Sequence, residues 1–78
     1  MDKLILDGEK IKDRQMLHDI LAEGLQLPEW YGRNLDALHD CLNDFAERPE
    51  IEIVNRDALE KNLGHYAVAL EKMLRVQR

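Results

Sequence analysis

Two short segments with strand character limit what this chain can fold into, because residues 8–49 separate them. Lys3–Asp7 is a short apolar run that Gly8 interrupts, and Glu50–Val54 alternates in polarity and is rich in β-branched residues. Strands joined by so long a connection, with helical periodicity along it, pair in parallel. The sequence therefore predicts a small parallel sheet with two visible strands.

Helical patterns account for most of the remaining chain. Asp13 is a natural cap for a first helix that ends near Gly24, with an apolar face of Met16, Leu17, Ile20, Leu21 and Leu25. After an extended loop at 27–33, Asn34 is expected to cap a second helix over 34–47. The inner stripe of this helix comprises Leu35, Leu38, Leu42 and Phe45, with Ala37 and Cys41 beside it.

Two more helices complete the pattern. A short one is expected after a cap at Asn55 or Asp57, and Gly64 closes it. A last helix towards the C-terminus is indicated by Tyr66, Leu70, Met73 and Leu74. We expect one α/β domain over residues 1–78, in which the small parallel sheet packs with about four helices.

The charge of the chain points to a basic partner. Its formal net charge is −5 and its pI is ≈ 5.1, which disfavours direct binding of nucleic acid, because phosphate recognition needs clustered Lys and Arg. No stretch approaches the length of a membrane span, and residues 1–25 lack the apolar run of a signal peptide. Cys41, the single cysteine, has no disulfide partner in the chain. We therefore expect a cytoplasmic protein without membrane association, and no motif predicts a cofactor.

The negative charge is concentrated in one segment. Residues 29–50 have a net charge of −4, from two bases, Arg33 and Arg48, and six acids, Glu29, Asp36, Asp40, Asp44, Glu47 and Glu50. The four-residue spacing of Asp36, Asp40 and Asp44 places them on one face of the predicted second helix. On or near the same face are His39, Asn43 and Glu47.

Two aromatic residues, Trp30 and Tyr31, come directly before this helix and are expected to be exposed. An amphipathic helix ordinarily has a solvated polar face, which is the plainer interpretation of the acids. Like charges at four-residue spacing repel each other, however, and aromatic residues beside charged ones are typical of interface anchors. The segment therefore favours a binding face.

The stretch LPEWYGRNLDALHDCL, residues 27–42, resembles the signature segment of the barstar family of ribonuclease inhibitors. The shared pattern, L-P-x-aromatic-Y-G-x-N-L-D-A-L-x-D-C-L, has no gaps, and a weaker resemblance extends over nearly the whole chain. The resemblance implies a small parallel sheet packed with helices. It also implies a protein that is not an enzyme and that occludes the basic active site of an extracellular-type or toxin ribonuclease, as immunity against that toxin.

The resemblance also implies which residues would bind the ribonuclease: Trp30, Gly32, Asn34, Asp36, His39, Asp40, Asn43 and Phe45. Asp40 would be the central acid, facing the Arg, Lys and His groups of the nuclease, and Asp36 a second acid. Trp30 would pack on a catalytic histidine. Gly32 and Asn34 would make polar contacts at the loop.

The remaining positions include departures from the family pattern. Asn43 and Phe45 would contact the rim of the interface, whereas His39 stands where the best-known member has a tryptophan. That member also supplies an acid from its last helix. Here Val76 is the nearest match to that position, and Glu71 lies a turn or more away.

The end of the sequence departs from the family as well. The family usually has a further strand after the last helix, but no β-branched run follows Leu74. Either the chain is truncated, or another chain supplies the missing packing. An open sheet edge with exposed apolar residues invites association. The sequence therefore raises the hypothesis of a homodimer.

Other functions stay open on the sequence alone. The acidic face could serve a general interaction module that binds a different basic protein. Asp36, His39 and Asp40 could share a helix face as a metal site or as the active site of a hydrolase, although no paired Cys/His pattern supports a metal site. Cys41 could form a nucleophilic pair with His39 or His65, although its place towards the inner face suits a buried apolar residue better.

One further histidine, His18, lies on the first predicted helix. The sequence names no partner for it, and it is expected to be isolated.

Overall fold

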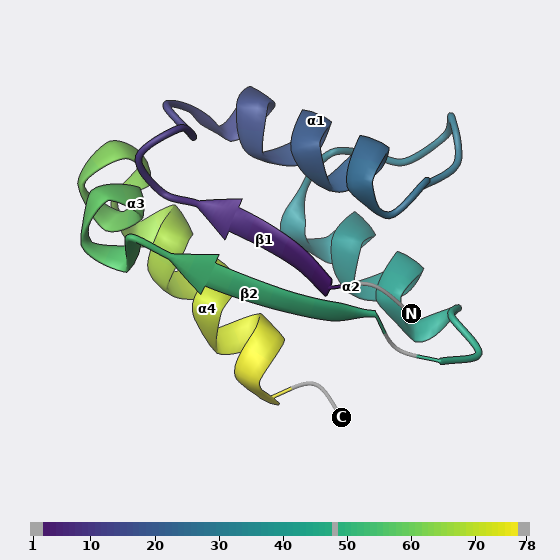
Figure 1. The fold of residues 1–78 in the computed structure, drawn as a ribbon. Coiled ribbons are helices and arrows are strands. Elements are labelled where there is room, and N and C mark those ends of the chain that lie inside the picture. The colour runs from purple at the N-terminus through teal and green to yellow at the C-terminus, as the bar shows by residue number, and fades with distance from the viewer. Residues whose placement is uncertain (1–2, 48, 77–78) are drawn as a thin grey trace.

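A computed structural model describes residues 3–47 and 49–76. Its elements follow in the order β1 (Lys3–Asp7), α1 (Arg14–Gly24), α2 (Leu35–Asn43), β2 (Glu50–Val54), α3 (Arg56–Leu63) and α4 (His65–Val76) (Figure 1). β1 and β2 pair in parallel, with Leu4 opposite Ile51 and Leu6 opposite Ile53. The expectation of an α/β fold, with a small parallel sheet and four helices, is confirmed.

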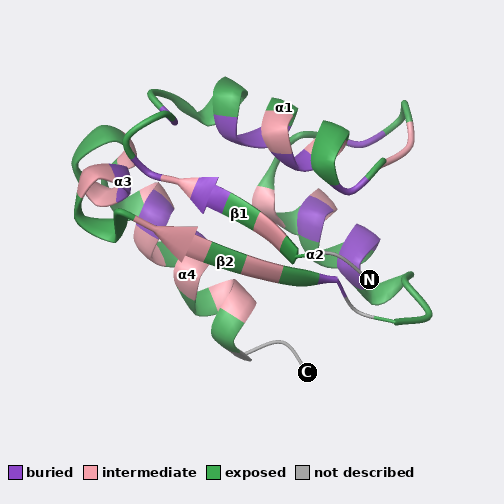
Figure 2. Ribbon diagram, viewed as in Figure 1, coloured by how far each residue is buried: buried purple, intermediate pink, exposed green. Residues whose placement is uncertain are grey.

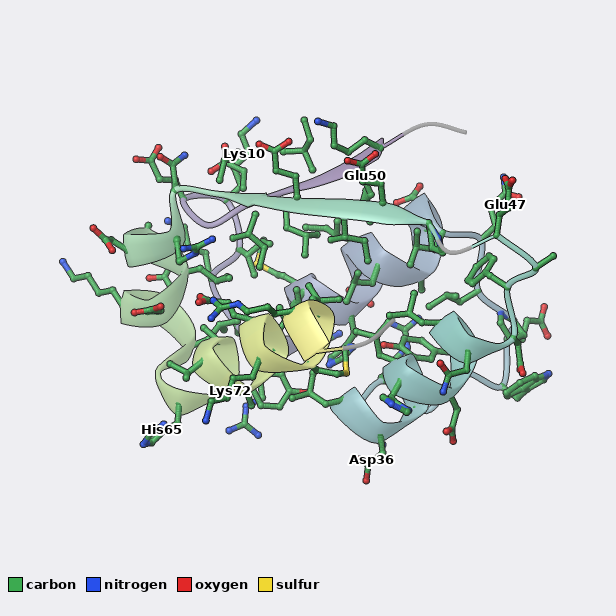
Figure 3. The ribbon with its side chains drawn as sticks, turned by 90° about the horizontal axis from the view of Figure 1, so that it is seen from below. Lys10, Asp36, Glu47, Glu50, His65 and Lys72 are labelled. Atoms are coloured by element: carbon green, nitrogen blue, oxygen red, sulfur yellow. The ribbon has the colours of Figure 1, made fainter. Side chains whose placement is uncertain are left out.

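The sheet forms one layer and the helices the other. Seen along the sheet, α1, α2, α3 and α4 all lie on one side of β1 and β2, and the side chain of Glu50 projects from the other side (Figure 3). Because strand side chains alternate, Leu6 points into the protein while Ile5 is 52% exposed. On the outer face the Lys3 ammonium lies 2.8 Å from the Glu52 carboxylate, which joins the two strands.

The core lies between these layers (Figure 2). It draws one or more side chains from β1, from every helix and from the loops: Leu6, Ile11, Leu17, Leu21, Leu25, Tyr31, Leu38, Cys41, Leu42, Leu59, Ala67 and Leu70. Fully burying a Leu or Ile side chain contributes about 1.5–3 kcal/mol, so these contacts hold the helices against the sheet.

Two of the three predicted helix caps, those at Asp13 and Asn34, are confirmed at atomic detail. The Asp13 carboxylate accepts a hydrogen bond from the Met16 backbone N–H at 2.8 Å, and Asn34 Oδ1 accepts one from the Ala37 N–H at 2.8 Å. Each cap satisfies an N–H group that has no partner within its own helix. The cap at Asn34 also sets where the acidic helix begins.

The prediction that the second helix extends to residue 47 is wrong. The backbone N–H groups of Asp44 and Phe45 donate three residues back, to the carbonyls of Cys41 (3.1 Å) and Leu42 (3.4 Å). These bonds tighten the last turn and end the helix, so α2 stops at Asn43. Phe45, which was placed on the inner stripe, lies beyond the helix and is 36% exposed.

The start of α3 departs from its predicted cap in one respect. Asn55 occupies the N-cap position, with a left-handed backbone (φ 53°), but its side chain makes no capping hydrogen bond. The Asn55 amide donates instead to Asp7 Oδ1 at 2.7 Å, which links the ends of the two strands. This bond and one from the Glu9 N–H lower the pKa of Asp7 below its ordinary value.

In residues 3–47 and 49–76, no helix combines the length and the apolar character needed to cross a bilayer.

Candidate functional site

The acids of α2 form an exposed stripe. Asp36 and Asp40 are both exposed, and the Asp40 side chain retains 84% of its accessible surface. The Asp36 side chain projects away from the body of the protein (Figure 3). Asp44 is the C-cap residue of the same helix and is also exposed. The helix therefore presents negative charge to any partner that docks on this side.

His39 lies within this stripe and contacts its own helix. Its side chain is 47% exposed, and its Nδ1 atom lies 3.9 Å from Asp40 Oδ1 and 3.4 Å from Asn43 Nδ2. A protonated His39 would therefore sit beside an acid of the stripe and offset part of its charge.

Trp30 is exposed, as predicted. The Tyr31 backbone N–H donates to the Pro28 carbonyl at 3.0 Å, which closes a turn with Glu29 and Trp30 at its centre. Trp30 lies at this turn with 74% of its surface accessible. A large aromatic residue left this exposed beside a charged stripe is a strong candidate for an interface anchor.

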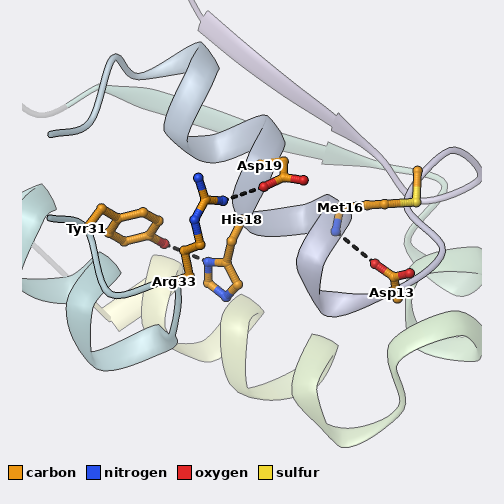
Figure 4. Close-up of polar contacts among 6 residues, drawn as sticks. All are labelled: Asp13, Met16, His18, Asp19, Tyr31 and Arg33. Carbon is orange, nitrogen blue, oxygen red and sulfur yellow. Dashed lines mark hydrogen bonds and ion pairs between the residues drawn. The ribbon is translucent and has the colours of Figure 1, made fainter. Parts of the chain in front are cut away.

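The expectation that Tyr31 is exposed is wrong. Tyr31 is only 6% exposed, and its hydroxyl lies 2.6 Å from His18 Nδ1 (Figure 4). His18 is not isolated either, because its Nε2 lies 2.7 Å from the Tyr66 hydroxyl and only 1% of the residue is exposed. Burial, and then the nearby Arg33 charge, lower the pKa of His18, which keeps the ring neutral at pH 7.

A sequence signal for the burial of His18 was present. The residue lies three and seven positions before Leu21 and Leu25, on the apolar face of α1. A histidine on such a face needs hydrogen-bond partners for both ring nitrogens.

The loop before α2 is shaped by local bonds. Arg33 has a left-handed backbone (φ 56°), and its guanidinium pairs with the Asp19 carboxylate of α1 (Figure 4). Asn34 Nδ2 donates to the Gly32 carbonyl at 3.3 Å while Oδ1 caps α2. A β-carbon on Gly32 would lie 3.2 Å from the Ala37 β-carbon. Gly32 and Asn34 thus have structural roles, and their contacts with a partner stay a prediction.

Phe45 and Asn43 lie at the end of the acidic helix. Asn43 is the last residue of α2. Phe45 lines a shallow hollow of ≈ 190 Å³ together with Gln26, Leu27, Pro28, Cys41 and Asp44. Pro28 of the Trp30 turn lines this hollow together with Cys41 and Asp44 at the end of α2, so the hollow borders the acidic stripe.

Glu71 lies apart from this surface. Its side chain is only 10% exposed and contacts Arg56 of α3, with 3.6 Å between Oε1 and Nε. Burial, and then the nearby Glu60 carboxylate, raise the pKa of Glu71. Glu71 also borders a hollow with Ile51 and Ile53 of β2, so it supplies no acid to the α2 stripe. Val76 ends α4, and its side chain lies outside the described part of the chain.

The two catalytic alternatives gain no support. Within residues 3–47 and 49–76, no three His, Cys, Asp or Glu side chains gather as a metal ion would require, so Asp36, His39 and Asp40 form no such group. Cys41 is 5% exposed, and burial raises the pKa of its thiol, which disfavours the reactive thiolate.

Comparison with known proteins agrees with the sequence pattern. The family model described as "Barstar (barnase inhibitor)" matches residues 1–77. A protein of Bacillus subtilis (strain 168), named "Putative ribonuclease inhibitor YrdF", is 50% identical over 38 residues, which are 49% of this chain. The matched part spans 42% of that relative, which is less than half of its length.

Proposed function

Because this chain belongs to the barstar family, we propose that it inhibits a bacterial ribonuclease of the barnase type by covering its basic active site. One observation carries this proposal. Trp30, which is 74% exposed, lies in the turn before the capped helix α2, and that helix bears the exposed acids Asp36 and Asp40. A cleft that binds RNA phosphates is lined with Arg, Lys and His groups. The stripe of α2 offers carboxylates to the same groups.

The proposed inhibitor acts by binding and carries out no chemistry of its own. Asp40 is the central acid and Asp36 the second, while Trp30 stacks against an active-site histidine. Gly32 and Asn34 contact the nuclease from the loop, and Asn43 and Phe45 contact it at the rim of the interface. His39 takes part in the same face, beside Asp40. Carboxylates on a rigid helix lose little conformational entropy on docking, which favours tight binding.

We place this interaction in the cytoplasm of the producing cell, as immunity against a toxic ribonuclease. Two observations support the setting. The chain is acidic, with a net charge of −5, which suits a basic protein partner rather than RNA. Its one cysteine, Cys41, is a buried thiol, which suits a reducing compartment.

Inhibition of a barnase-type ribonuclease at two salt concentrations tests the proposal. We expect inhibition at both, with slower association at the higher salt, because the Debye length falls from about 30 Å at 0.01 M to about 8 Å at 0.15 M. Barnase with barstar is itself a leading example of such steering, so this expectation is not independent of the family. A folded protein, verified by circular dichroism, that inhibits at neither salt concentration would direct attention to a different basic partner.

We also propose that two copies of the chain associate through β2. Among the described residues β2 pairs only with β1, so one of its edges has no strand beside it. Next to β2, a hollow of ≈ 190 Å³ is lined in part by Ile51, Ile53 and Leu74. Open edges with apolar neighbours favour strand pairing. We expect a dimer in sedimentation at micromolar concentration, and a monomer alone would contradict it.

A further inference from the structure

The Trp30 turn is tied to α1 at two points. The first is the hydrogen bond between the Tyr31 hydroxyl and His18 Nδ1, at 2.6 Å. The second is the ion pair between Arg33 and Asp19, whose side chains are about half exposed. Exposed ion pairs contribute little, typically less than about 1 kcal/mol, because water screens them. The buried bond at Tyr31 is therefore the stronger of the two ties.

His18 connects three elements that are distant in the sequence. Its ring lies on α1, Tyr31 belongs to the loop before α2, and Tyr66 belongs to α4. The ring centroids of the two tyrosines lie 5.7 Å and 5.9 Å from that of His18, both in tilted or edge-on contact. A neutral imidazole has one donor and one acceptor, so one tyrosine hydroxyl donates to it and the other accepts from it.

The two tyrosines differ in the part of the chain that their hydrogen bonds to His18 restrain. Tyr31 is the direct chain neighbour of Trp30, and the peptide bond between them is fixed by the 3.0 Å bond to Pro28. Tyr66 lies at the start of α4, a regular helix, and packs beneath the Arg14 guanidinium, with 4.3 Å from the Arg14 Cζ to its ring centroid. Of the two tyrosine hydroxyl bonds to His18, only that of Tyr31 therefore restrains the position of Trp30.

We propose that His18 and Tyr31 are positioning residues for inhibition: their hydrogen bond holds the Trp30 turn in the conformation that meets the ribonuclease. This inference rests on the proposed function, because it assigns a role within the same surface. An anchor that is held in place before docking avoids the entropy cost of ordering it in the complex. Loss of the bond would leave the tyrosine ring packed but free the turn to move.

Tyr31→Phe and Tyr66→Phe form a matched pair, because each removes one hydroxyl from the same imidazole and keeps the aromatic ring. At pH 7.5, where His18 is neutral, we expect Tyr31→Phe to weaken inhibition roughly 3- to 10-fold, the cost of ordering one or two side chains. Tyr66→Phe should stay within about twofold of the parent. A merely structural role for His18 predicts equal effects of the two variants, and that outcome would overturn the proposal.

The fluorescence of Trp30 supplies a readout that needs no nuclease, since it is the only tryptophan of the chain. In the free protein we expect lower steady-state anisotropy, and stronger quenching by acrylamide, for Tyr31→Phe than for the parent and Tyr66→Phe. Unchanged anisotropy in a folded Tyr31→Phe variant would refute the proposal. If that variant does not fold, His18→Gln breaks the same tie from its other end and should give the same result.

The two readouts separate the two proposals. If the parent fails to inhibit the ribonuclease, the proposed function falls, and the anisotropy comparison alone decides whether His18 and Tyr31 position the turn.

Discussion

Asp40→Ala is expected to weaken inhibition of a barnase-type ribonuclease by roughly 30- to 5000-fold. The range corresponds to about 2–5 kcal/mol, the usual cost of removing one partner of a buried charge pair across an interface. Measurements on barnase and barstar contribute to that range, so its size is carried over from the family. The physical reason is that the basic groups of the nuclease would stay desolvated without a counter-charge.

The stability of the free protein should not fall with this substitution. The Asp40 side chain is 84% exposed, and Asp36 and Asp44 lie four residues to either side of it. Like charges at this spacing destabilise a helix by about 0.2–0.5 kcal/mol per pair, and alanine has the higher helix propensity. We therefore expect equal or slightly higher stability in urea denaturation. A loss of inhibition without a loss of stability would locate Asp40 in the interface.

Two further variants control for charge and shape. Asp57→Ala removes the same charge from α3, far from α2 in the fold (Figure 1), and should change inhibition less than about threefold. Asp40→Asn retains the shape of the side chain without its charge and should resemble Asp40→Ala. Equal losses from Asp57→Ala and Asp40→Ala would mean that net charge, rather than the α2 stripe, determines binding.

Features set by neighbours in sequence were predictable. Asp13 and Asn34 cap their helices because each side chain bonds to a backbone N–H only three residues away. The alternation of polar and apolar residues along β2 likewise predicts which of its side chains point inward. The exposure of Asp40 follows from its position opposite the apolar residues of α2. Each of these features depends on the residues of a single helix or strand.

Features that depend on contacts between elements escaped prediction. Tyr31 is buried because it meets His18, which is 13 residues away, and His18 also needs Tyr66, which is 48 residues away. No local pattern brings these three side chains together. The Asn55 side chain makes no capping hydrogen bond for the same kind of reason, because its amide donates instead to Asp7 on the neighbouring strand. The polar scaffold behind the Trp30 turn is thus a property of the tertiary structure.

Gly8→Ala is expected to lower the free energy of unfolding by about 3 kcal/mol or more. Gly8 follows β1 and its N–H donates to the Val54 carbonyl at 2.9 Å, which holds it against the end of β2. A β-carbon there would lie 2.2 Å from the Asn55 carbonyl oxygen and 2.6 Å from the Leu59 nitrogen. Both are backbone atoms, so no side-chain rotation can relieve the overlap, and the start of α3 would have to move.

The chain has little stability to lose. At about 0.05–0.15 kcal/mol per residue, a protein of 78 residues is stable by roughly 4–12 kcal/mol, so a loss of about 3 kcal/mol is between roughly a quarter and three quarters of the total. Gly24→Ala is the matched control, because the three atoms nearest to its β-carbon would all belong to the Leu4 side chain, with Cδ1 at 2.7 Å, Cδ2 at 3.1 Å and Cγ at 3.4 Å, and none to the backbone. We expect it to cost less than Gly8→Ala, because overpacking of about 1–3 kcal/mol is partly offset by the roughly 0.5–1 kcal/mol by which alanine is favoured over glycine in a helix such as α1. Far-UV circular dichroism is the appropriate probe for urea unfolding, since Trp30 is exposed in the native state and would report the transition weakly. Similar urea midpoints for Gly8→Ala and Gly24→Ala would mean that the contact between Gly8 and the start of α3 is looser than these distances require.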